Sequence, residues 1–409
     1  MEKMVQQIII KSGNKLFKQL DNLCFLSKNL YNATLYKVRQ HYFSTGKHLS
    51  YAAVNKIMKE ERNEDYYALP TKVSQQTQKL VDNSYKSYFA LVKLFKKGEL
   101  KDMPKTPYYM KKDGRQVVMF TNQAFQLVSN GIRLGRNGVV IKTNIKSPQF
   151  VRLIPNGTSV TIEIGYTVEC QDIKKCGQVA AIDIGVNNLA ALTFKHGKPI
   201  IYNGKPVKSI NQYYNKQMAK LRSRQDKSGS DRHYTKRMSK LSLKRKCKIK
   251  DYFHKTSREL VNQLVSNKVS VLVIGHNNLW KQDTNLGKKN NQKFVQIPFN
   301  NFIQMLQYKC KLIGIKVILQ EESYTSKCSF LDGDYIPTYG IDGNLCKPSG
   351  RRIKRGLYRT KDKRFINADV NGSYNILSKF LKEASNTNLL DIVDLVEVCS
   401  TPSVFTVKR

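Results

Sequence analysis

Acidic residues and long apolar segments are scarce in this sequence. Of its 409 residues only 30 are Asp or Glu, against 71 Lys and Arg, so the formal net charge is +41. No run of about 20 apolar residues is present, which argues against a membrane-spanning helix. Residues 1–11 lack the charged, apolar and small-residue order of a signal peptide. We therefore expect no contact with a membrane and no secretion.

Paired cysteines are also lacking. The eight cysteines stand singly, at positions 24, 170, 176, 247, 310, 328, 346 and 399. Because no Cys-x-x-Cys pair occurs and no signal peptide is evident, we interpret them as reduced thiols rather than as a disulfide framework.

The excess of positive charge points to a polyanionic partner. A net charge of +41 opposes a compact state through self-repulsion unless a polyanion neutralises it. The 22 tyrosines are interleaved with lysines, and basic residues hold phosphates while aromatic rings stack on bases. The alternatives are a ribosomal or chromatin protein, a merely soluble basic surface, and an anionic membrane surface. No basic amphipathic helix with a strong apolar face stands out, so we favour nucleic acid.

The pattern of apolar residues along the chain changes twice, which predicts a multidomain α+β protein. Residues 16–102 have helical apolar spacing, whereas residues 103–178 contain short β-like runs separated by Pro and Gly. Together with a strand near residues 4–10, these runs suggest a small β-barrel that carries the helices as an insertion. From residue 179 the order is three strands, a long basic helical stretch, strand, helix, strand and helix. That is the order of an RNase H-like domain.

Acidic residues stand at three places where predicted strands or helices of that last region begin or end. Asp183 ends an apolar strand before Gly185, and Asp369 opens the last helix. Glu321 and Glu322 follow the strand at 316–320. Carboxylate oxygens suit Mg²⁺ or Mn²⁺, and two-metal phosphodiester hydrolysis needs several of them. The alternatives without a catalytic role are a turn residue for Asp183, a helix cap for Asp369 and an exposed charged loop for the glutamates.

These motifs resemble those of a known family. The segments are Ala-Ile-Asp-Ile-Gly-Val-Asn-Asn (181–188), Tyr-Thr-Ser-Lys (324–327) and Ile-Asn-Ala-Asp-Val-Asn-Gly-Ser-Tyr-Asn-Ile (366–376). They are similar to the RuvC motifs of TnpB proteins and of their relatives, the Fanzor proteins and type V CRISPR effectors. The stretch around His254 and Lys255 resembles the His-Lys-x-Ser stretch of that family's helical connector. Residues 69–77 resemble its N-terminal recognition region.

The resemblance implies an RNA-guided DNA endonuclease associated with a transposon. In such proteins a guide RNA pairs with a double-stranded DNA target while the protein reads a short adjacent motif. The implied partners are the guide RNA and the DNA, bound by a monomer in a ribonucleoprotein, with Mg²⁺ or Mn²⁺ as cofactor. The implied location is cytoplasmic and nucleoid-associated in a prokaryote, and nuclear if the source is a eukaryote or its virus.

The resemblance also implies a domain plan and nucleic-acid-binding residues. The plan is a β-barrel wedge domain (1–15 and 103–178), a helical recognition domain (16–102), a RuvC-like RNase H-fold nuclease domain (179–327 and 352–383), a degenerate zinc-finger-like insert (328–351) and a C-terminal tail (384–409). Candidates for reading the adjacent motif are Lys72, Gln76, Thr121 and Asn122. Further candidates for nucleic-acid contact are His254, Lys255, Lys281 and Gln282. The last two stand in a polar basic loop, for which the alternative interpretation is a solvated loop without a binding role.

Two departures from the family pattern matter. Gly275 stands where most members carry a catalytic Glu, so we predict that Glu322 is the displaced third carboxylate beside Asp183 and Asp369, with Glu321 as the alternative. The empty position also allows a nuclease-inactive, RNA-guided DNA-binding repressor, and a plain RNA-binding protein is the remaining rival. Second, only Cys328 and Cys346 remain in the insert, so we expect no structural zinc site there.

Overall fold

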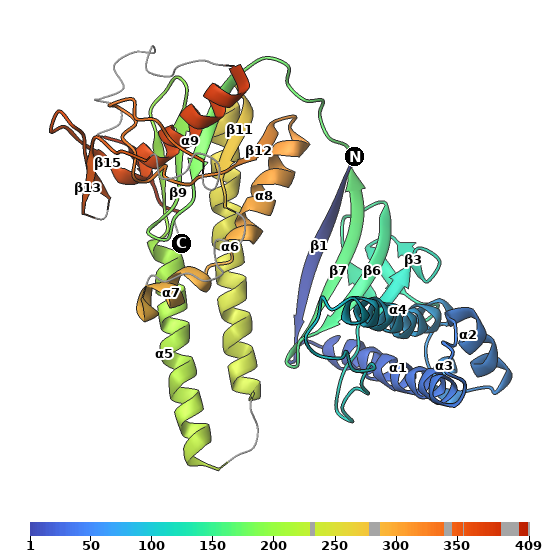
Figure 1. The fold of residues 1–409 in the computed structure, drawn as a ribbon. Coiled ribbons are helices and arrows are strands. Elements are labelled where there is room, and N and C mark those ends of the chain that lie inside the picture. Colours follow the sequence, from blue (N-terminus) through green and yellow to red (C-terminus); the bar gives the residue numbers. More distant parts are fainter. Residues whose placement is uncertain (230–233, 278–286, 339–345, 355, 386–400, 408–409) are drawn as a thin grey trace. The chain divides into compact units, whose positions relative to one another are not determined.

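A computed structural model describes residues 1–229, 234–277, 287–338, 346–354, 356–385 and 401–407 (Figure 1). The chain divides into two compact units, one of Met1 and Lys3–Val168 and the other of Glu2 and Glu169–Arg409. Each unit has its own buried apolar cluster or clusters. Both units contain helices and strands, so the protein is of mixed α/β type, as expected. No described helix is both long enough and apolar enough to cross a membrane.

The strands of the first unit form two separate sheets. The larger has the order β1-β7-β6-β2, from β1 (Glu2–Lys11), β7 (Ser159–Val168), β6 (Pro148–Pro155) and β2 (Val118–Thr121). The smaller joins β3 (Phe125–Val128), β4 (Gly131–Leu134) and β5 (Val140–Lys142) as an antiparallel meander.

Two of the helices of the first unit, α1 (Phe17–Thr45) and α4 (Thr71–Lys96), cover its larger sheet, and the other two, α2 (Tyr51–Glu60) and α3 (Glu64–Tyr67), pack against them. α1 and α4 contact each other, and both contact strands of the four-stranded sheet. The expected closed β-barrel is therefore not found among the described residues. Because the helices bury the apolar side of the sheet, its strands need not close on themselves.

The second unit is built on one mixed sheet of order β12-β11-β8-β9-β10-β16. β8 (Gln178–Asp183), β9 (Asn188–Phe194) and β10 (Ile200–Asn203) are antiparallel neighbours. β11 (Val269–Gly275) and β12 (Lys316–Gln320) run parallel to β8. β16 (Ser403–Phe405) pairs in parallel with β10. The sequence predicted only a tail where β16 lies.

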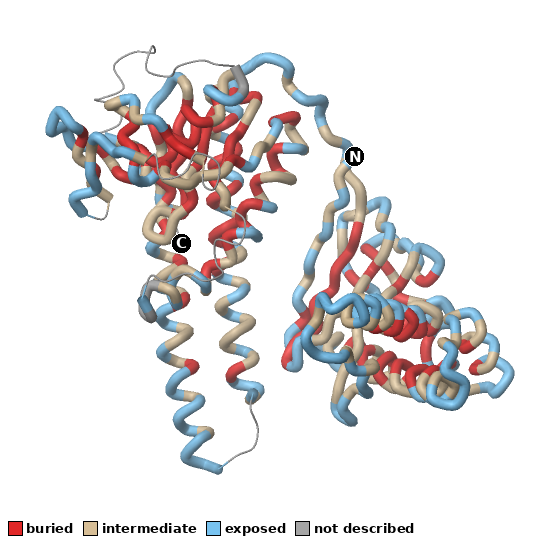
Figure 2. The backbone as a smooth tube through the Cα atoms, in the orientation of Figure 1, coloured by how far each residue is buried: buried red, intermediate tan, exposed pale blue. Residues whose placement is uncertain are grey.

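Helices cover both faces of this sheet. α6 (Lys236–Ser266) and α8 (Phe299–Leu312) share one apolar cluster with Ala180 and Ile182 of β8. α9 (Ala368–Ser385) shares the other with Ala181 of β8 and Val273 of β11. Strands buried on both faces are nearly continuous apolar runs, which is the pattern of β8 and β11 in the sequence. Within the second unit, Figure 2 shows the buried residues concentrated in this sheet and its covering helices.

The remaining elements lie outside the central sheet. α5 (Lys205–Lys227) follows β10 and contacts α6, and α7 (Lys288–Val295) precedes α8. β13 (Arg351–Lys354), β14 (Leu357–Arg359) and β15 (Phe365–Asn367) form a small antiparallel sheet that leads directly into α9. The sequence did not predict this sheet, because its strands are short and the first, β13, consists largely of exposed basic residues.

Candidate functional site

Strand alternation directs Asp183 toward α9. Side chains two residues apart on a strand point to the same face, and Ala181 belongs to the apolar cluster that includes α9. Asp183, the last residue of β8, therefore lies on that face too. Its carboxylate approaches Gly372 of α9 so closely that a Cβ on Gly372 would lie 2.9 Å from Asp183 Oδ2. A glycine at 372 is thus what leaves room for the carboxylate.

Asp369 lies in the first turn of α9 but does not cap the helix. Asn367 does so, because its Oδ1 accepts hydrogen bonds from the backbone N–H groups of Asp369 (3.0 Å) and Val370 (3.3 Å). The Asp369 carboxylate instead accepts from Asn188 Nδ2 at 2.6 Å and from Arg352 Nη2 at 3.0 Å. The helix-cap alternative for Asp369 is therefore wrong, and its carboxylate is held by residues of two other segments.

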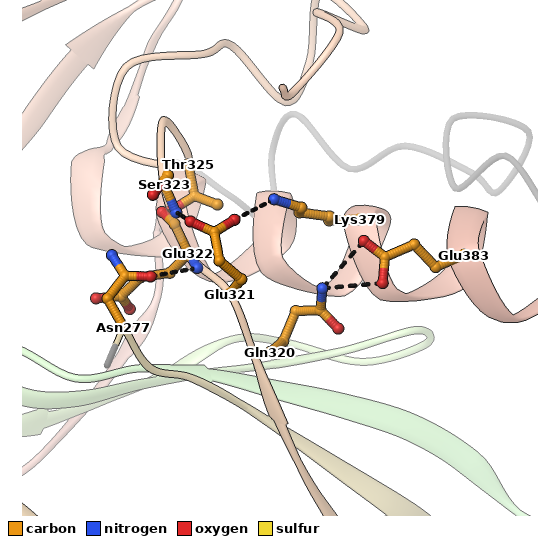
Figure 3. Close-up of polar contacts among 8 residues, drawn as sticks. All are labelled: Asn277, Gln320, Glu321, Glu322, Ser323, Thr325, Lys379 and Glu383. Carbon is orange, nitrogen blue, oxygen red and sulfur yellow. Dashed lines mark hydrogen bonds and ion pairs between the residues drawn. The ribbon is translucent and has the colours of Figure 1, made fainter. Parts of the chain in front are cut away.

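Glu321 and Glu322 face in different directions after β12 ends. The Glu321 carboxylate accepts hydrogen bonds from Lys379 of α9 and from the backbone N–H of Ser323 (Figure 3). Lys379 is only 5% exposed and Glu321 is 33% exposed, so Lys379 is the buried partner of this ion pair. Glu322 is held at its backbone N–H, which donates to Asn277 Oδ1 at 3.0 Å. Thr325 closes the turn by donating from Oγ1 to the Glu322 carbonyl at 2.8 Å.

The carboxylate of Glu322 lies beside the vacant position on β11. A Cβ on Gly275 would be 2.6 Å from Glu322 Oε2 and 2.4 Å from Ile376 Cδ1 of α9. Gly275 follows Ile274, which pairs with Ile182, and Asp183 follows Ile182. Because β8 and β11 are parallel, both residues lie at the same edge of the sheet. The structure therefore brings Glu322 from the next strand to the place where a side chain at 275 would stand.

Electrostatics couple these carboxylates. Burial, and then the negative charge of Asp369, raises the pKa of Asp183 to about 7, although Arg352 opposes this. Burial, and then the charges of Asp183 and Glu321, raises the pKa of Glu322 to about 8. Burial alone would raise the pKa of Glu321 as well, but hydrogen bonds from Lys379 and Ser323 outweigh it and lower that pKa. Asp183 is thus repelled from two sides, whereas Glu321 already has its counter-ion.

The donor set of Asp183, Glu322 and Asp369 fits a hard divalent cation in its chemistry. All three side chains offer carboxylate oxygen, the ligand that Mg²⁺ prefers. A guanidinium, that of Arg352, already sits against Asp369 as a counter-charge. As they stand, no three His, Cys, Asp or Glu side chains within the described residues are close enough to hold a metal ion together. The three side chains therefore suit Mg²⁺ because they offer carboxylate oxygens whose mutual repulsion a cation would relieve. Their present positions do not form a complete set of metal ligands.

Of the four residues expected to read an adjacent DNA motif, one lines a cavity. Gln76 on α4 borders a cavity of about 660 Å³ together with Met119 of β2 and Arg152 of β6. Lys72 is exposed one turn earlier on α4. Thr121 ends β2, and Asn122 is exposed in the turn that follows. Lys72, Thr121 and Asn122 do not border that cavity, so the structure does not gather the four residues around it.

His254 and Lys255 lie on α6 and border a second cavity, of about 560 Å³, with residues 405–407. The His254 carbonyl accepts a hydrogen bond from Lys309 Nζ at 2.8 Å. Burial, and then the charges of Lys309 and Lys250, lowers the pKa of His254. Lys255 forms an ion pair with Asp251 at 3.1 Å. Lys281 and Gln282 lie outside the described residues.

The cysteines of the insert approach each other. Cys328 Sγ and Cys346 Sγ are 3.7 Å apart. The nearby aspartates are engaged in local hydrogen bonds. Asp334 Oδ2 accepts from the backbone N–H groups of Ser329 and Ser349, and Asp332 Oδ2 accepts from Ser349 Oγ. Both carboxylates therefore stabilise the loop itself.

Sequence reasoning missed several residues that position the carboxylates. Asn188, Arg352 and Asn277 each hold a member of the acidic group, and Lys379 removes Glu321 from it. Asn188 stands five residues after Asp183 in the same motif, and that short spacing was a usable signal. Arg352 gave none, because it is one of many basic residues in an exposed segment.

Two protein-family models match the part of the chain that carries this site. The model OrfB_IS605, described as a probable transposase, matches residues 162–281. The model of the Cas12f1-like TNB domain matches residues 299–376. Asp183 lies within the first match, and Glu322 and Asp369 lie within the second.

Two curated proteins are also similar. The CRISPR-associated endodeoxyribonuclease Cas12f2 of a Micrarchaeota archaeon (strain CG1_02_47_40) is 29% identical over 232 residues, which are 54% of this chain and 40% of that protein. The TnpB-like protein ORF457 of Acidianus two-tailed virus is 22% identical over 214 residues, 50% of this chain and 42% of that protein. The match thus spans less than half the length of either relative.

Among solved structures, that of the mini-RNA-guided endonuclease CRISPR-Cas_phi3 covers 92% of this chain and 92% of its own, at 10% identity and a TM-score of 0.45. A Cas12f1–sgRNA–target DNA complex covers 91% and 98%, at 14% identity and a TM-score of 0.36. These likenesses are distant in both sequence and shape. The family models and the curated relatives, however, agree with the resemblance of the motifs, since the parts of the chain that carry the site are similar to TnpB-like and Cas12f-type proteins.

Proposed function

We propose that this protein is an RNA-guided DNA endonuclease, associated with a transposon, whose second unit is an RNase H-like nuclease domain of the RuvC type. The observation that carries the proposal is that Asp183 lies near enough to Asp369 and to Glu322, which come from distant segments, for their charges to raise the pKa of Asp183 and of Glu322. The strand pairing supports the RNase H-like assignment: three antiparallel strands, β8 to β10, extended by β11 and β12 parallel to β8. The family matches to a probable transposase over residues 162–281 and to a Cas12f1-like domain over residues 299–376 support the RNA-guided part of the proposal.

In this proposal Asp183, Glu322 and Asp369 would hold the divalent ions. Mg²⁺ or Mn²⁺, when bound, would lower the pKa of an attacking water and support the leaving oxygen of the phosphodiester. Asn188 and Arg352 hold Asp369 in place through its two carboxylate oxygens. Asn277 and Thr325 fix the backbone of Glu322, which keeps its side chain aimed at the edge. Burial of Asp183 and Glu322 limits the screening of their charges by bulk water, which strengthens their attraction for a cation.

The position of Glu322 also weighs against a nuclease-inactive repressor. That alternative depended on the missing side chain at Gly275. Glu322 Oε2 would be 2.6 Å from a Cβ there, so a carboxylate is supplied from β12 instead. Glu321 is the weaker choice for the third carboxylate, because Lys379 already pairs with it.

Nucleic-acid binding follows from charge. The net charge of +41 needs a polyanion, and we infer that guide RNA and target DNA provide it. His254, Lys255 and the outlying Lys281 and Gln282 stay candidates for contact with these partners, and so do Lys72, Gln76, Thr121 and Asn122 for the adjacent motif. A monomeric ribonucleoprotein in the nucleoid or nucleus remains our expectation.

The test is cleavage by the complex as it purifies. The co-purified RNA would be sequenced, and its variable end used to design a plasmid target with a randomised flank. We expect cutting that requires Mg²⁺ or Mn²⁺ and disappears in Asp183→Asn, while RNA-guided DNA binding persists. A wild-type complex that binds its target but never cuts, with either ion, would overturn the endonuclease and leave the repressor. Equal loss of binding in Asp183→Asn would mean that Asp183 acts structurally.

A further inference from the structure

The two long helices of the second unit enclose a cationic cleft. α5 and α6 lie side by side as a helical hairpin (Figure 1). The cleft between them has a volume of about 320 Å³. Its cationic lining residues are Lys220 and Arg224 from α5 and Arg237, Lys240 and Lys244 from α6. No acidic side chain borders it.

The spacing of these cations aims them at the cleft. Lys220 and Arg224 are four residues apart, and Arg237, Lys240 and Lys244 follow at intervals of three and four. Residues at these spacings share one face of a helix. A cation that merely serves solubility belongs on the face turned away from a packed neighbour. Here each helix presents a row of cations to the seam with the other helix, where apolar contact is the usual arrangement.

The repulsion among these cations is not relieved within the described residues. All five are exposed, and none forms an ion pair with a described acidic group. α5 contains seven Lys and Arg against one Asp, and α6 contains ten against two acidic residues. Like charges four residues apart destabilise a helix. An anion seated in the cleft would remove that cost.

Arg245 provides an internal contrast. It also faces α5, but its guanidinium donates to Asn211 Oδ1 at 2.6 Å and to the Gln296 carbonyl at 2.7 Å. Its guanidinium carbon lies 5.0 Å from the centre of the Tyr214 ring. Arg245 therefore fastens the two helices together, and this keeps the cleft in shape. The five lining cations have no such structural duty.

We propose that a single-stranded segment of nucleic acid binds in this cleft through its phosphates, an inference that rests on the proposed function only in taking nucleic acid as the partner. The row on α6 is about 10 Å long at about 1.5 Å per residue, so it can lie along successive phosphates of a single strand. The exposed ring of Tyr213 borders the cleft and can stack on an unpaired base. A duplex keeps its bases stacked inside and is too wide for the seam between two contacting helices.

The experiment compares two double variants of the full chain. Arg224→Gln with Lys240→Gln removes two cations from the cleft. The control, Arg222→Gln with Lys246→Gln, removes one Arg and one Lys from the same two helices at exposed positions that do not line it. Binding of a fluorescent single-stranded RNA of about 20 nucleotides would be measured between about 50 and 200 mM salt. Single-stranded DNA and duplex DNA of the same sequence would be measured in parallel.

For the cleft variant, we expect the slope of log K against log salt for single-stranded RNA to be less steep by about 1.4, because each phosphate that the protein no longer neutralises lowers the slope by about 0.7. The control should stay near wild type, and so should the charge-preserving Arg224→Lys with Lys240→Arg. Melting temperatures would confirm that all variants fold. Slopes equal to those of the control for both single strands would overturn the cleft, and a weakening confined to duplex DNA would overturn the assignment to a single strand.

Failure here is distinguishable from failure of the proposed function. If the slope changes as expected and the wild type never cuts DNA, the binding cleft is supported and the proposed endonuclease activity is refuted. If the wild type cuts DNA and the slope does not change, the reverse holds.

Discussion

Gly275→Ala is the substitution that most directly tests the displaced carboxylate. The added methyl would lie 2.6 Å from Glu322 Oε2 and 2.4 Å from Ile376 Cδ1. Contacts under about 3 Å between heavy atoms are strongly repulsive, so both side chains must move. Both are flexible ends rather than backbone, so the protein should still fold. Overpacking of this kind costs about 1–3 kcal/mol, or roughly 2–4 °C in melting temperature per kcal/mol for a domain of this size.

The effect on cleavage should exceed the effect on stability. If Glu322 is a ligand of the ions, moving its carboxylate misplaces it, and we expect Mg²⁺-dependent cleavage to fall by about tenfold or more. Binding of the guided DNA should be unchanged, because no group that binds phosphate is removed. The assay is single-turnover cleavage of a matched plasmid, with binding measured in parallel.

A second substitution separates the two clashes. Adding Ile376→Val removes the Cδ1 atom and should restore most of the melting temperature, while the clash with Glu322 remains and cleavage stays impaired. If Ile376→Val restores cleavage along with stability, the impairment came from apolar overpacking. The reasoning about Glu322 would then be refuted. Full cleavage by Gly275→Ala itself would refute it more directly.

Three further predictions concern the residues around these carboxylates and one ion pair of the first unit. Glu322→Gln should keep binding and lower the cleavage rate by about 10³-fold or more, whereas Glu321→Gln should lower the free energy of unfolding by about 2 kcal/mol because it strands the buried Lys379; cleavage rates and urea unfolding of both variants decide this, and the opposite pattern would exchange the two roles. Asn188→Ala should raise the Mg²⁺ concentration needed for half-maximal cleavage by about 10–100-fold, because Asp369 loses the partner that orients it; an unchanged Mg²⁺ dependence would show that Arg352 suffices. In the first unit, burial alone would raise the pKa of Asp82, but hydrogen bonds from Lys86 and His48 lower this pKa below its ordinary 3.8. The ionised carboxylate therefore stabilises the fold fully above pH 3.8, and this stabilisation is lost as the pH falls through the lowered pKa of the folded protein. Asp82→Asn should lower the free energy of unfolding by about 1–2 kcal/mol at pH 7 and by progressively less below about pH 4, and a pH-independent difference between the two proteins would contradict this.

The order of elements was readable from the sequence because local patterns determine it. The apolar runs that became β8 and β11 are buried on both faces, and the runs at 16–43 and 71–95 have helical spacing. The same patterns placed Asp183 at a strand end and Asp369 at the start of a helix. The spacing of the apolar residues and the Gly and Pro residues that interrupt it carry this information without reference to the rest of the chain.

The sequence also narrowed the candidates for a third carboxylate to two adjacent residues, of which we predicted Glu322, but strand alternation alone does not decide between them. Alternation along a strand says only that Glu321 and Glu322 point in opposite directions. The choice depends on where α9 places Lys379, 58 positions beyond Glu321, and on the space that Gly275 leaves on β11. Both are packing relationships between segments distant in sequence.

Tertiary structure likewise decided the form of the N-terminal strands and the cleft between α5 and α6. Short strands with turns are compatible with a closed barrel or with open sheets. What selected open sheets was the cover provided by α1 and α4, and strand pattern does not encode that cover. The basic stretch at 210–264 is readable as two helices. That five of its cations face each other across one cleft follows only from how those helices lie together.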